Sequence, residues 1–297
     1  MSKSQNRFEG IFPAAITPFD ENEDIDESKL TEFLDFLIDR GVHGIYLLGT
    51  NGEAPLLDIE EKKKVIDISI EHVNGKVPIV AGTMCNSTKK TIEVASWAEK
   101  KGADAVHIVI PYYFPSPHKV VLNHFERISK EIDLPIFVYS IPQRTGNELT
   151  MRTLKALSDI DNVVALKDSS GDIEFFYRCL HEIDELCLFG GNDSLINTYL
   201  TLGGDGSVTA VGNAFPELVS SIYDQHIEGK IEDVSLAQNK VLKIKNMLRK
   251  GPYLSGIKAA LKVRGYDFGE VRKPLKPYSD YQMKELKKSL DDLGLLR

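Results

Sequence analysis

The sequence has few cysteines and no long apolar run, and each absence argues against a class of protein. Its three cysteines, Cys85, Cys179 and Cys187, are an odd number without a CxxC spacing, which argues against a disulfide framework and a thiolate metal site. No apolar stretch approaches the roughly 18 residues that a membrane-spanning helix needs. The start of the chain lacks the apolar segment of a signal peptide. We therefore expect a cytoplasmic protein with no membrane partner.

Basic residues are not concentrated anywhere along the chain. The 36 lysines and arginines and 44 aspartates and glutamates give a formal net charge of −8. Because the basic residues form no cluster, nucleic acid is not expected as a partner. Hydrophobic residues make up 42% and charged residues 27% of the 297 positions, which is ordinary for a globular chain and excludes disordered, collagen-like and coiled-coil classes.

Short β-branched runs alternate with amphipathic stretches of helical length. The runs predict eight strands, near residues 11–17, 44–48, 78–81, 105–110, 135–139, 163–167, 186–189 and 206–210. The stretches between them predict helices near 28–40, 59–73, 87–101, 118–132, 151–158, 173–183 and 194–202, with Asp58, Ser87, Thr150 and Asp172 as N-caps. Eight such units in about 210 residues favour an α/β fold of the closed (β/α)8 TIM-barrel type over an open sheet.

Only helices are expected after residue 210, near 215–228, 231–249, 254–264 and 279–293. The first closes the eighth unit, and the other three form a C-terminal α-helical extension. We expect a catalytic barrel domain over residues 1–229 and the extension over 230–297. No linker rich in proline, glycine or serine separates the two.

Unusual polar residues stand at the ends of the second, fourth, fifth and sixth predicted strands, where the functional residues of such barrels lie. Lys167 ends an apolar run, which would place its amine beside desolvating walls, where a lysine pKa falls and the neutral amine attacks carbonyls. A solvated loop lysine is the alternative. Tyr139 also suits simple packing with its hydroxyl at the rim. Arg144, in a loop that contains proline, fits a surface charge as well as a carboxylate clamp.

A turn with the sequence Gly49-Thr50-Asn51-Gly52 ends the second predicted strand. Backbone N–H groups in such a turn can hold a carboxylate, although a plain tight turn is equally compatible with the sequence. The seven histidines show neither HxH nor HExxH spacing, so we expect no catalytic metal and no other cofactor.

Together these segments resemble the family of dihydrodipicolinate synthases and N-acetylneuraminate lyases, class I aldolases that form a Schiff base with pyruvate. The resemblance spans residues 12–275 and rests on a G[ST]xGE turn, a YxxPxxTG segment and a KDSSGD segment at the ends of the second, fifth and sixth predicted strands. It implies that Lys167 forms an imine with pyruvate or another 2-keto acid, with Tyr139 as general acid/base.

The resemblance also implies roles for further residues. Thr50 and Tyr113 would complete a proton relay, with Tyr113 reaching in from a neighbouring subunit of a homotetramer built as a dimer of dimers. The backbone N–H groups of Thr50 and Asn51 would bind the pyruvate carboxylate. Gly191 and Val208 would line the pocket.

Two residues bear on the aldehyde that reacts with pyruvate. In the family's synthases an arginine at the place of Arg144 binds the carboxylate of aspartate semialdehyde, which a planar guanidinium suits. Asn51 replaces the second hydroxyl residue of many synthases and is shared with other aldolases of the family. The resemblance therefore implies a 4-hydroxy-tetrahydrodipicolinate synthase, a lyase that joins pyruvate to aspartate semialdehyde. The alternative is a 2-keto-3-deoxy sugar-acid aldolase, for example for 2-keto-3-deoxygluconate, or a 4-hydroxy-2-oxoglutarate aldolase.

Two other classes of function make different predictions for the same residues. A barrel that binds a ligand without turnover would have lost the lysine or the tyrosine, and both are present. A phosphate-binding barrel enzyme is suggested by Gly190-Gly191 and Gly203-Gly204, which follow late strands where phosphate sites often lie. In that case a phosphorylated substrate, and not pyruvate, would protect the enzyme.

Overall fold

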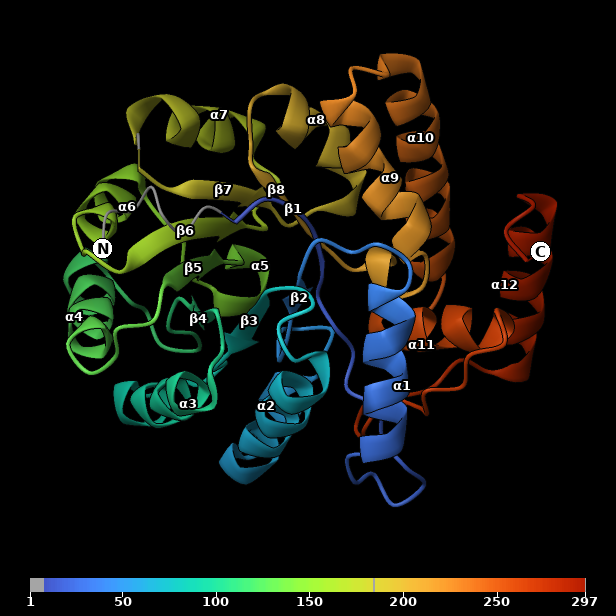
Figure 1. The fold of residues 1–297 in the computed structure, drawn as a ribbon, viewed down its shortest axis with the longest axis horizontal. Coiled ribbons are helices and arrows are strands. Elements are labelled where there is room, and N and C mark those ends of the chain that lie inside the picture. The colour runs from blue at the N-terminus through green and yellow to red at the C-terminus, as the bar shows by residue number, and fades with distance from the viewer. Residues whose placement is uncertain (1–7, 184, 297) are drawn as a thin grey trace.

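Eight parallel strands form the centre of the computed structural model, which describes residues 8–183 and 185–296 (Figure 1). The strands hydrogen-bond in the order β1-β8-β7-β6-β5-β4-β3-β2, and a parallel bridge between Ala14 and Tyr46 joins the two ends. Their bounds are β1 Gly10–Pro13, β2 Ile45–Tyr46, β3 Ile79–Gly82, β4 Ala105–Val109, β5 Ile136–Ser140, β6 Val163–Asp168, β7 Cys187–Gly190 and β8 Gly206–Thr209. The predicted TIM barrel is confirmed. The start of the chain, on which the signal-peptide expectation rested, lies outside the described residues.

The predicted strands near 11–17 and 44–48 are too long. The first ends at Pro13, and the apolar residues beyond it continue as a buried loop, because burial alone does not distinguish a strand from a covered loop. The second has only Ile45 and Tyr46 in the ladder before the chain leaves the sheet toward the mouth of the barrel.

Helices follow the strands and cover the barrel (Figure 1). All four predicted N-caps, Asp58, Ser87, Thr150 and Asp172, accept a hydrogen bond from the backbone N–H three residues on. The helices are α1 Glu27–Ile38, α2 Ile59–Val73, α3 Thr88–Lys101, α4 His118–Ser129, α5 Pro142–Thr145, α6 Met151–Ser158, α7 Ile173–Glu182, α8 Ile196–Thr201 and α9 Pro216–Ile227, with 3-10 turns η2 Ala54–Leu56, η3 Asp193–Leu195 and η4 Val211–Asn213. Helix α5 and the 3-10 turns are not predictable from the sequence pattern, because segments of three or four residues carry no periodicity.

The extension consists of α10 Ile231–Leu248, α11 Tyr253–Val263 and α12 Asp280–Asp292, which lie together on one side of the barrel, at the right of Figure 1. Helix α10 packs against α9 and η3, and η3 follows strand β7. Residues of the extension thereby reach the mouth of the barrel. The predicted division after residue 229 falls between α9 and α10 and stays a prediction.

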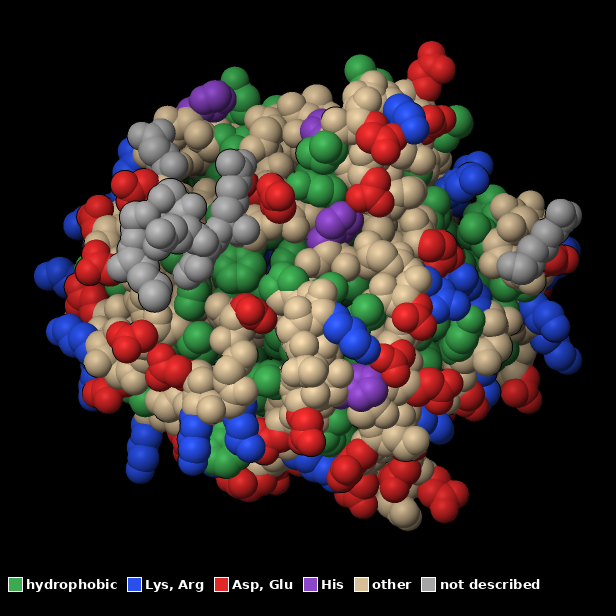
Figure 2. All heavy atoms as spheres, viewed as in Figure 1, with side chains coloured by type: hydrophobic (Ala, Val, Ile, Leu, Met, Phe, Trp, Pro, Cys, Tyr) green, Lys and Arg blue, Asp and Glu red, His purple; other side chains and the backbone are tan. Residues whose placement is uncertain are grey.

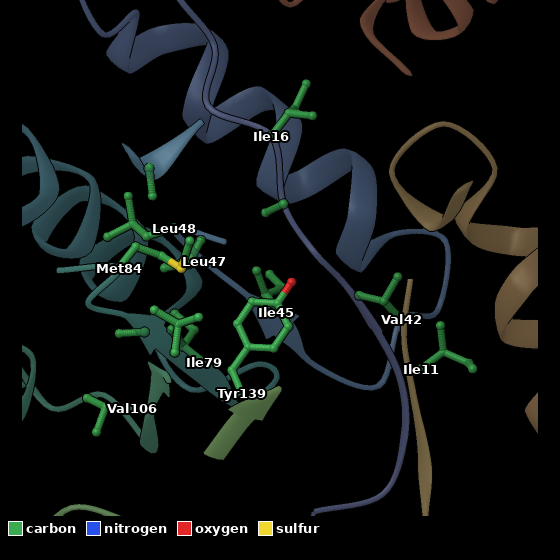
Figure 3. Packing of buried hydrophobic residues seen from close by; sticks show 14 of the residues in the cluster. Ile11, Ile16, Val42, Ile45, Leu47, Leu48, Ile79, Met84, Val106 and Tyr139 are labelled. Atoms are coloured by element: carbon green, nitrogen blue, oxygen red, sulfur yellow. The ribbon is translucent and has the colours of Figure 1, made fainter. Parts of the chain in front are cut away.

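Aromatic rings fill the inside of the barrel. Phe12 lies edge-on to Phe189 at 5.3 Å between centroids, and Phe137 lies 5.6 Å from Phe189. These rings belong to an interior cluster distinct from the larger core between strands and helices, part of which is drawn in Figure 3. Because the interior is packed, functional groups gather where the strands end.

The surface view in Figure 2 shows acidic and basic side chains interspersed on one face of the molecule. In the part of the chain that the structure describes, no helix combines the length and the apolar character that crossing a membrane requires.

Candidate active site

A cavity of about 300 Å³ opens at the carboxyl ends of the strands. Strands β5, β6 and β8 contribute to its wall, together with the segments that follow β2 and β7. All of the site residues predicted from the sequence line this cavity except Tyr113, namely Thr50, Asn51, Tyr139, Arg144, Lys167, Gly191 and Val208. The structure therefore gathers residues from distant parts of the sequence into one site.

Lys167 lies in β6 with only 3% of its surface exposed. Its Nζ atom is 4.1 Å from the ring centroid of Tyr46 and 3.9 Å from that of Tyr139. Within the described residues no carboxylate forms an ion pair with it. Burial lowers the pKa of Lys167 to about 7, and Asp193 opposes that shift. A sizeable fraction of the side chain is therefore a neutral amine near pH 7, the form that attacks carbonyl carbons.

A stacked pair of rings lies behind Lys167. The rings of Tyr46 and His107 are parallel to within 11° at 3.8 Å between centroids. His107 Nε2 donates to the carbonyl of Leu47 at 2.8 Å, since a carbonyl can only accept, and this hydrogen bond leaves Nδ1 unprotonated. Burial holds the pKa of His107 well below its usual range, with the charge of Lys167 acting in the same direction. A Cβ at Gly82 would lie 2.2 Å from His107 Nε2, so the ring fits only beside a glycine.

Tyr139 projects from β5 among aliphatic side chains of neighbouring strands (Figure 3). Its hydroxyl lies 3.4 Å from Thr50 Oγ1, which brings together two members of the predicted proton relay. Burial raises the pKa of Tyr139, against the opposing effect of hydrogen bonds with Thr50 and Ser169. The phenol is therefore protonated at neutral pH and has a proton to donate.

The loop after β6 is held in shape by Asp168. Its carboxylate accepts the Ser170 hydroxyl at 2.6 Å and the Ser170 N–H at 3.2 Å, and burial raises the pKa of Asp168 to about 6. The N–H of Gly191 donates to the Asp168 carbonyl at 2.7 Å. A Cβ at Gly191 would lie 2.0 Å from Ser169 Oγ, so this glycine lets the loops after β6 and β7 touch at the mouth.

Arg144 and Tyr113 lie farther out. Arg144 belongs to α5, is exposed and lines the cavity, and no ion pair is found for it within the described residues. Tyr113 is 84% exposed and adopts a φ of 76°, and it does not line the cavity of its own chain. A single copy of the chain therefore leaves Tyr113 outside the group of predicted site residues.

Sequence reasoning missed several residues of the cavity. Asp193, 4% exposed, accepts the N–H groups of Ala210 and Val211 at 3.0 and 3.1 Å and the Tyr253 hydroxyl at 3.3 Å. Lys245 reaches the same wall from α10. An aspartate directly after a Gly-Gly-Asn segment at a strand end was a usable signal for Asp193, whereas nothing in the sequence indicates that α10 and α11 return to the mouth.

Metal-ligating side chains are not clustered in the described part of the chain. Among residues 8–183 and 185–296 there is no group of three or more histidine, cysteine, aspartate or glutamate side chains arranged to hold a metal ion. The site offers a buried amine, a phenol and a carboxylate instead.

A TIM barrel with an unpaired lysine and a tyrosine at its mouth has the architecture of a class I aldolase, and comparison with known proteins agrees. The model of the dihydrodipicolinate synthetase family matches residues 7–293. The chain belongs to this family and is thus an enzyme of the lyase class.

Individual relatives cover nearly the whole chain. A 4-hydroxy-tetrahydrodipicolinate synthase of Bacillus subtilis is 34% identical over 96% of this chain and 99% of its own length. An uncharacterised DapA-like lyase of Halobacterium salinarum is 39% identical over 97% of this chain and 94% of its own length.

Solved structures show the same likeness. Dihydrodipicolinate synthase from Thermotoga maritima superposes with a TM-score of 0.91 at 31% identity, covering 97% of this chain and 99% of that one. A prophage protein of the dihydrodipicolinic acid synthase family from E. coli K12, solved in complex with pyruvate, gives 0.93 at 28% identity with the same coverage of 97% and 99%.

Proposed function

We propose that this protein condenses pyruvate with aspartate semialdehyde through an imine on Lys167, as a 4-hydroxy-tetrahydrodipicolinate synthase. The observation that carries the proposal is the Lys167 amine, buried against the rings of Tyr46 and Tyr139 without a carboxylate partner among the described residues. Such an amine is a nucleophile at neutral pH. The pyruvate complex of the E. coli K12 relative supports pyruvate as the donor, and the Bacillus subtilis synthase supports the reaction.

The reaction proceeds in steps that use the side chains at the mouth of the barrel one after another. The Lys167 amine adds to the keto carbon of pyruvate and water leaves, which forms the imine. Loss of a proton from the methyl carbon gives an enamine, and its carbon attacks the aldehyde carbon of the acceptor. Tyr139 donates a proton to the aldehyde oxygen as that bond forms, and Thr50, 3.4 Å away, passes a proton back to it. With aspartate semialdehyde, the acceptor's amino group then adds to the imine carbon and expels the Lys167 amine, which closes the ring of the product. With an acceptor that lacks an amino group, water adds to the imine carbon instead and restores the amine.

The turn after β2 holds the carboxylate of pyruvate. Thr50 and Asn51 line the cavity, and the N–H groups of such a turn suit an anion. Gly191 and Val208, from β7's loop and β8, form the wall beside the bound pyruvate.

Tyr113 acts on a second copy of the chain, and the assembly is a homotetramer, a dimer of dimers. The exposed ring and the left-handed backbone of Tyr113 support this role, because a non-glycine residue keeps such a conformation only where the surroundings impose it. An apolar cavity of about 230 Å³ beside Thr50, also lined by Met84, Tyr112 and Leu254, has room for an incoming ring. Analytical ultracentrifugation of the wild type and of Tyr113→Ala tests the assembly.

Arg144 binds the carboxylate of aspartate semialdehyde, since its guanidinium lines the cavity without an ion pair in the described chain. Arg144→Ala should weaken use of that aldehyde by roughly 2 to 4 kcal/mol in transition-state terms while pyruvate imine formation persists. Equal loss of both steps would mean that Arg144 has a structural role.

Asn51 favours a second candidate, a 2-keto-3-deoxy sugar-acid or 4-hydroxy-2-oxoglutarate aldolase, because an amide stands where many synthases carry a hydroxyl. A panel that pairs pyruvate with aspartate semialdehyde, glyceraldehyde, glyoxylate and N-acetylmannosamine decides between them. Turnover of glyceraldehyde or glyoxylate without aspartate semialdehyde would favour the aldolase.

Trapping with borohydride tests the imine itself. Pyruvate plus borohydride should add one reduced pyruvate to Lys167, located by intact-protein and peptide mass spectrometry. An adduct on another lysine, or none, would defeat the mechanism, and chelators should leave activity unchanged.

A further inference from the structure

The cavity is far more positive than the protein that contains it. Its lining includes Arg144, Lys245 and Arg249 in addition to Lys167, but only one acid, Asp193. The chain as a whole carries a net charge of −8. Pyruvate brings a single carboxylate, for which the turn at Thr50 and Asn51 is proposed. The remaining cations therefore face a part of the cavity that pyruvate does not occupy.

Lys245 is a buried ammonium without an ion pair. It is 5% exposed, and its Nζ donates to Ser194 Oγ at 3.0 Å and to Asn192 Oδ1. Within the described residues no carboxylate pairs with it. A buried ammonium with only neutral acceptors is unfavourable unless a ligand supplies the missing charge.

Asp193 supplies part of the missing counter-charge but forms no ion pair with Lys245 among the described residues. One of its carboxylate oxygens accepts two backbone N–H groups, from Ala210 and Val211, and the other accepts the hydroxyl of Tyr253. Burial lowers the pKa of Lys245, Arg249 acts in the same direction, and the Asp193 charge opposes them. The two cations of α10 thus repel each other, and a bound anion would relieve that repulsion.

We propose that Lys245 and Arg249 form an anion subsite that shares with Arg144 the anionic group of the acceptor, so that the acceptor aldehyde carries a carboxylate or phosphate group at the end remote from its carbonyl. This inference rests on the proposed function. Helix α10 belongs to the C-terminal extension, which thereby takes part in selecting the substrate. Short aldehydes with an anionic end are the accepted class, and neutral sugar aldehydes lose the contribution of these two cations.

The test uses enzyme in which pyruvate has been reduced onto Lys167, because the acceptor cavity is then complete but chemistry cannot proceed. Titration calorimetry compares succinate, glycerol 3-phosphate and neutral erythritol, so the first two ligands distinguish carboxylate from phosphate. Lys245→Met and Arg249→Met should each weaken binding of the preferred anion by about tenfold or more. Lys243→Met, an exposed lysine of the same helix that does not line the cavity, is the matched control and should leave binding unchanged.

Steady-state kinetics give a second readout. The same two variants should raise KM for an anionic acceptor by about tenfold with kcat little changed, and should leave glyceraldehyde kinetics as they are. Arg249→Lys, which keeps the charge, should recover much of the lost affinity. If Lys245→Met does not fold, Arg249→Met decides, because that side chain is exposed.

Anion binding that is unchanged in the folded variants, or equal loss with glyceraldehyde, would overturn the anion subsite. Failure to trap pyruvate on Lys167 would instead overturn the proposed function. Succinate and glycerol 3-phosphate titrated into the unmodified protein and its variants would then decide the subsite on its own.

Discussion

Two lysines of this chain are equally buried but lie in contrasting surroundings. Lys167 stands at the mouth of the barrel and Lys258 stands where α11 meets the turn after β2, and each is 3% exposed. Lys258 forms an ion pair with Glu53 at 2.9 Å and donates to the carbonyls of Thr17 and Glu270 at 2.9 and 2.8 Å. All three of its N–H groups have an acceptor, which links the extension to the barrel.

The amine of Lys167 lies against aromatic rings, whereas the amine of Lys258 is surrounded by oxygen atoms. Burial lowers the pKa of both side chains, but at Lys258 the Glu53 carboxylate at 2.9 Å opposes the shift, and three oxygen atoms hold the ammonium in place. At Lys167 the acid that opposes the shift is Asp193, whose oxygens are already engaged by Ala210 and Tyr253. Burial alone therefore does not make a lysine reactive. The difference is that Lys167 has no carboxylate partner within the described residues, whereas Lys258 has Glu53.

Substitution of each lysine by methionine should give the largest difference between the two roles. Lys167→Met should lower turnover of pyruvate by about four orders of magnitude or more, because the imine has no other amine to form on. Lys258→Met should lose stability but keep the adduct on Lys167 in its folded fraction. Borohydride trapping with mass spectrometry, together with a steady-state assay, measures both effects. A pyruvate adduct in Lys167→Met would contradict this assignment.

The pH dependence of imine formation measures the same contrast in the wild type. Because the pKa of Lys167 is lowered to about 7, the rate of trapping by pyruvate and cyanoborohydride should rise with pH around a midpoint near 7. A midpoint near 10 would show that the amine is solvated.

Stability should follow the same titration. Below pH 7 both folded and unfolded chains hold the proton, and the folded chain bears a buried charge. From about pH 7 upward the folded chain releases a proton that the unfolded chain keeps, so the contribution of Lys167 to stability rises by up to about 1.4 kcal/mol per pH unit. Lys167→Met should therefore be stabilising below pH 7, with a benefit that shrinks toward pH 10 in denaturant titrations.

Removal of the carboxylate beside Lys258 should make its surroundings resemble those of an unpaired cation. Glu53→Gln leaves the Lys258 ammonium buried without its counter-charge, which should lower the free energy of unfolding by about 3 to 5 kcal/mol. Glu60→Gln is the control, since Glu60 pairs with Lys63 but is 79% exposed, and it should change stability by less than about 0.5 kcal/mol. Denaturant unfolding compares the two, and similar small losses would contradict a structural role for the buried pair.

The sequence could predict Lys167 but not the difference between the two lysines. Lys167 ends an apolar β-branched run, which made it a candidate beside the alternative of a solvated loop lysine. The KDSSGD and YxxPxxTG segments, through the resemblance to the family, then selected Lys167 and Tyr139, and the alternation of patterns predicted all eight strands. Lys258 is separated from its contact at Thr17 by 241 positions, and Lys245 from Asn192 by 53, so their partners depend on how the extension packs. No periodicity in one segment carries that information.

The stacked rings of Tyr46 and His107 behind Lys167 could not be predicted from the sequence for a related reason. Tyr46 and His107 look like ordinary members of apolar strands until the barrel register brings β2, β3 and β4 together. Only then does Gly82 become the gap into which the His107 ring fits, and Tyr46 the face on which Lys167 rests.

The smallest expected effect concerns the Tyr46 ring beside Lys167. Tyr46→Ala removes the ring 4.1 Å from the Lys167 amine and admits water, which should raise the pKa of Lys167 by about one unit and slow imine formation at pH 7 by up to about tenfold. Tyr46→Phe keeps the ring, so the trapping midpoint should stay in place. It should not lose stability either, because the buried Tyr46 hydroxyl has no hydrogen-bond partner among the described residues. A shifted trapping midpoint in Tyr46→Phe, or an unshifted one in Tyr46→Ala, would contradict this. It would show that the ring does not exclude water from Lys167 and that the low pKa has another source.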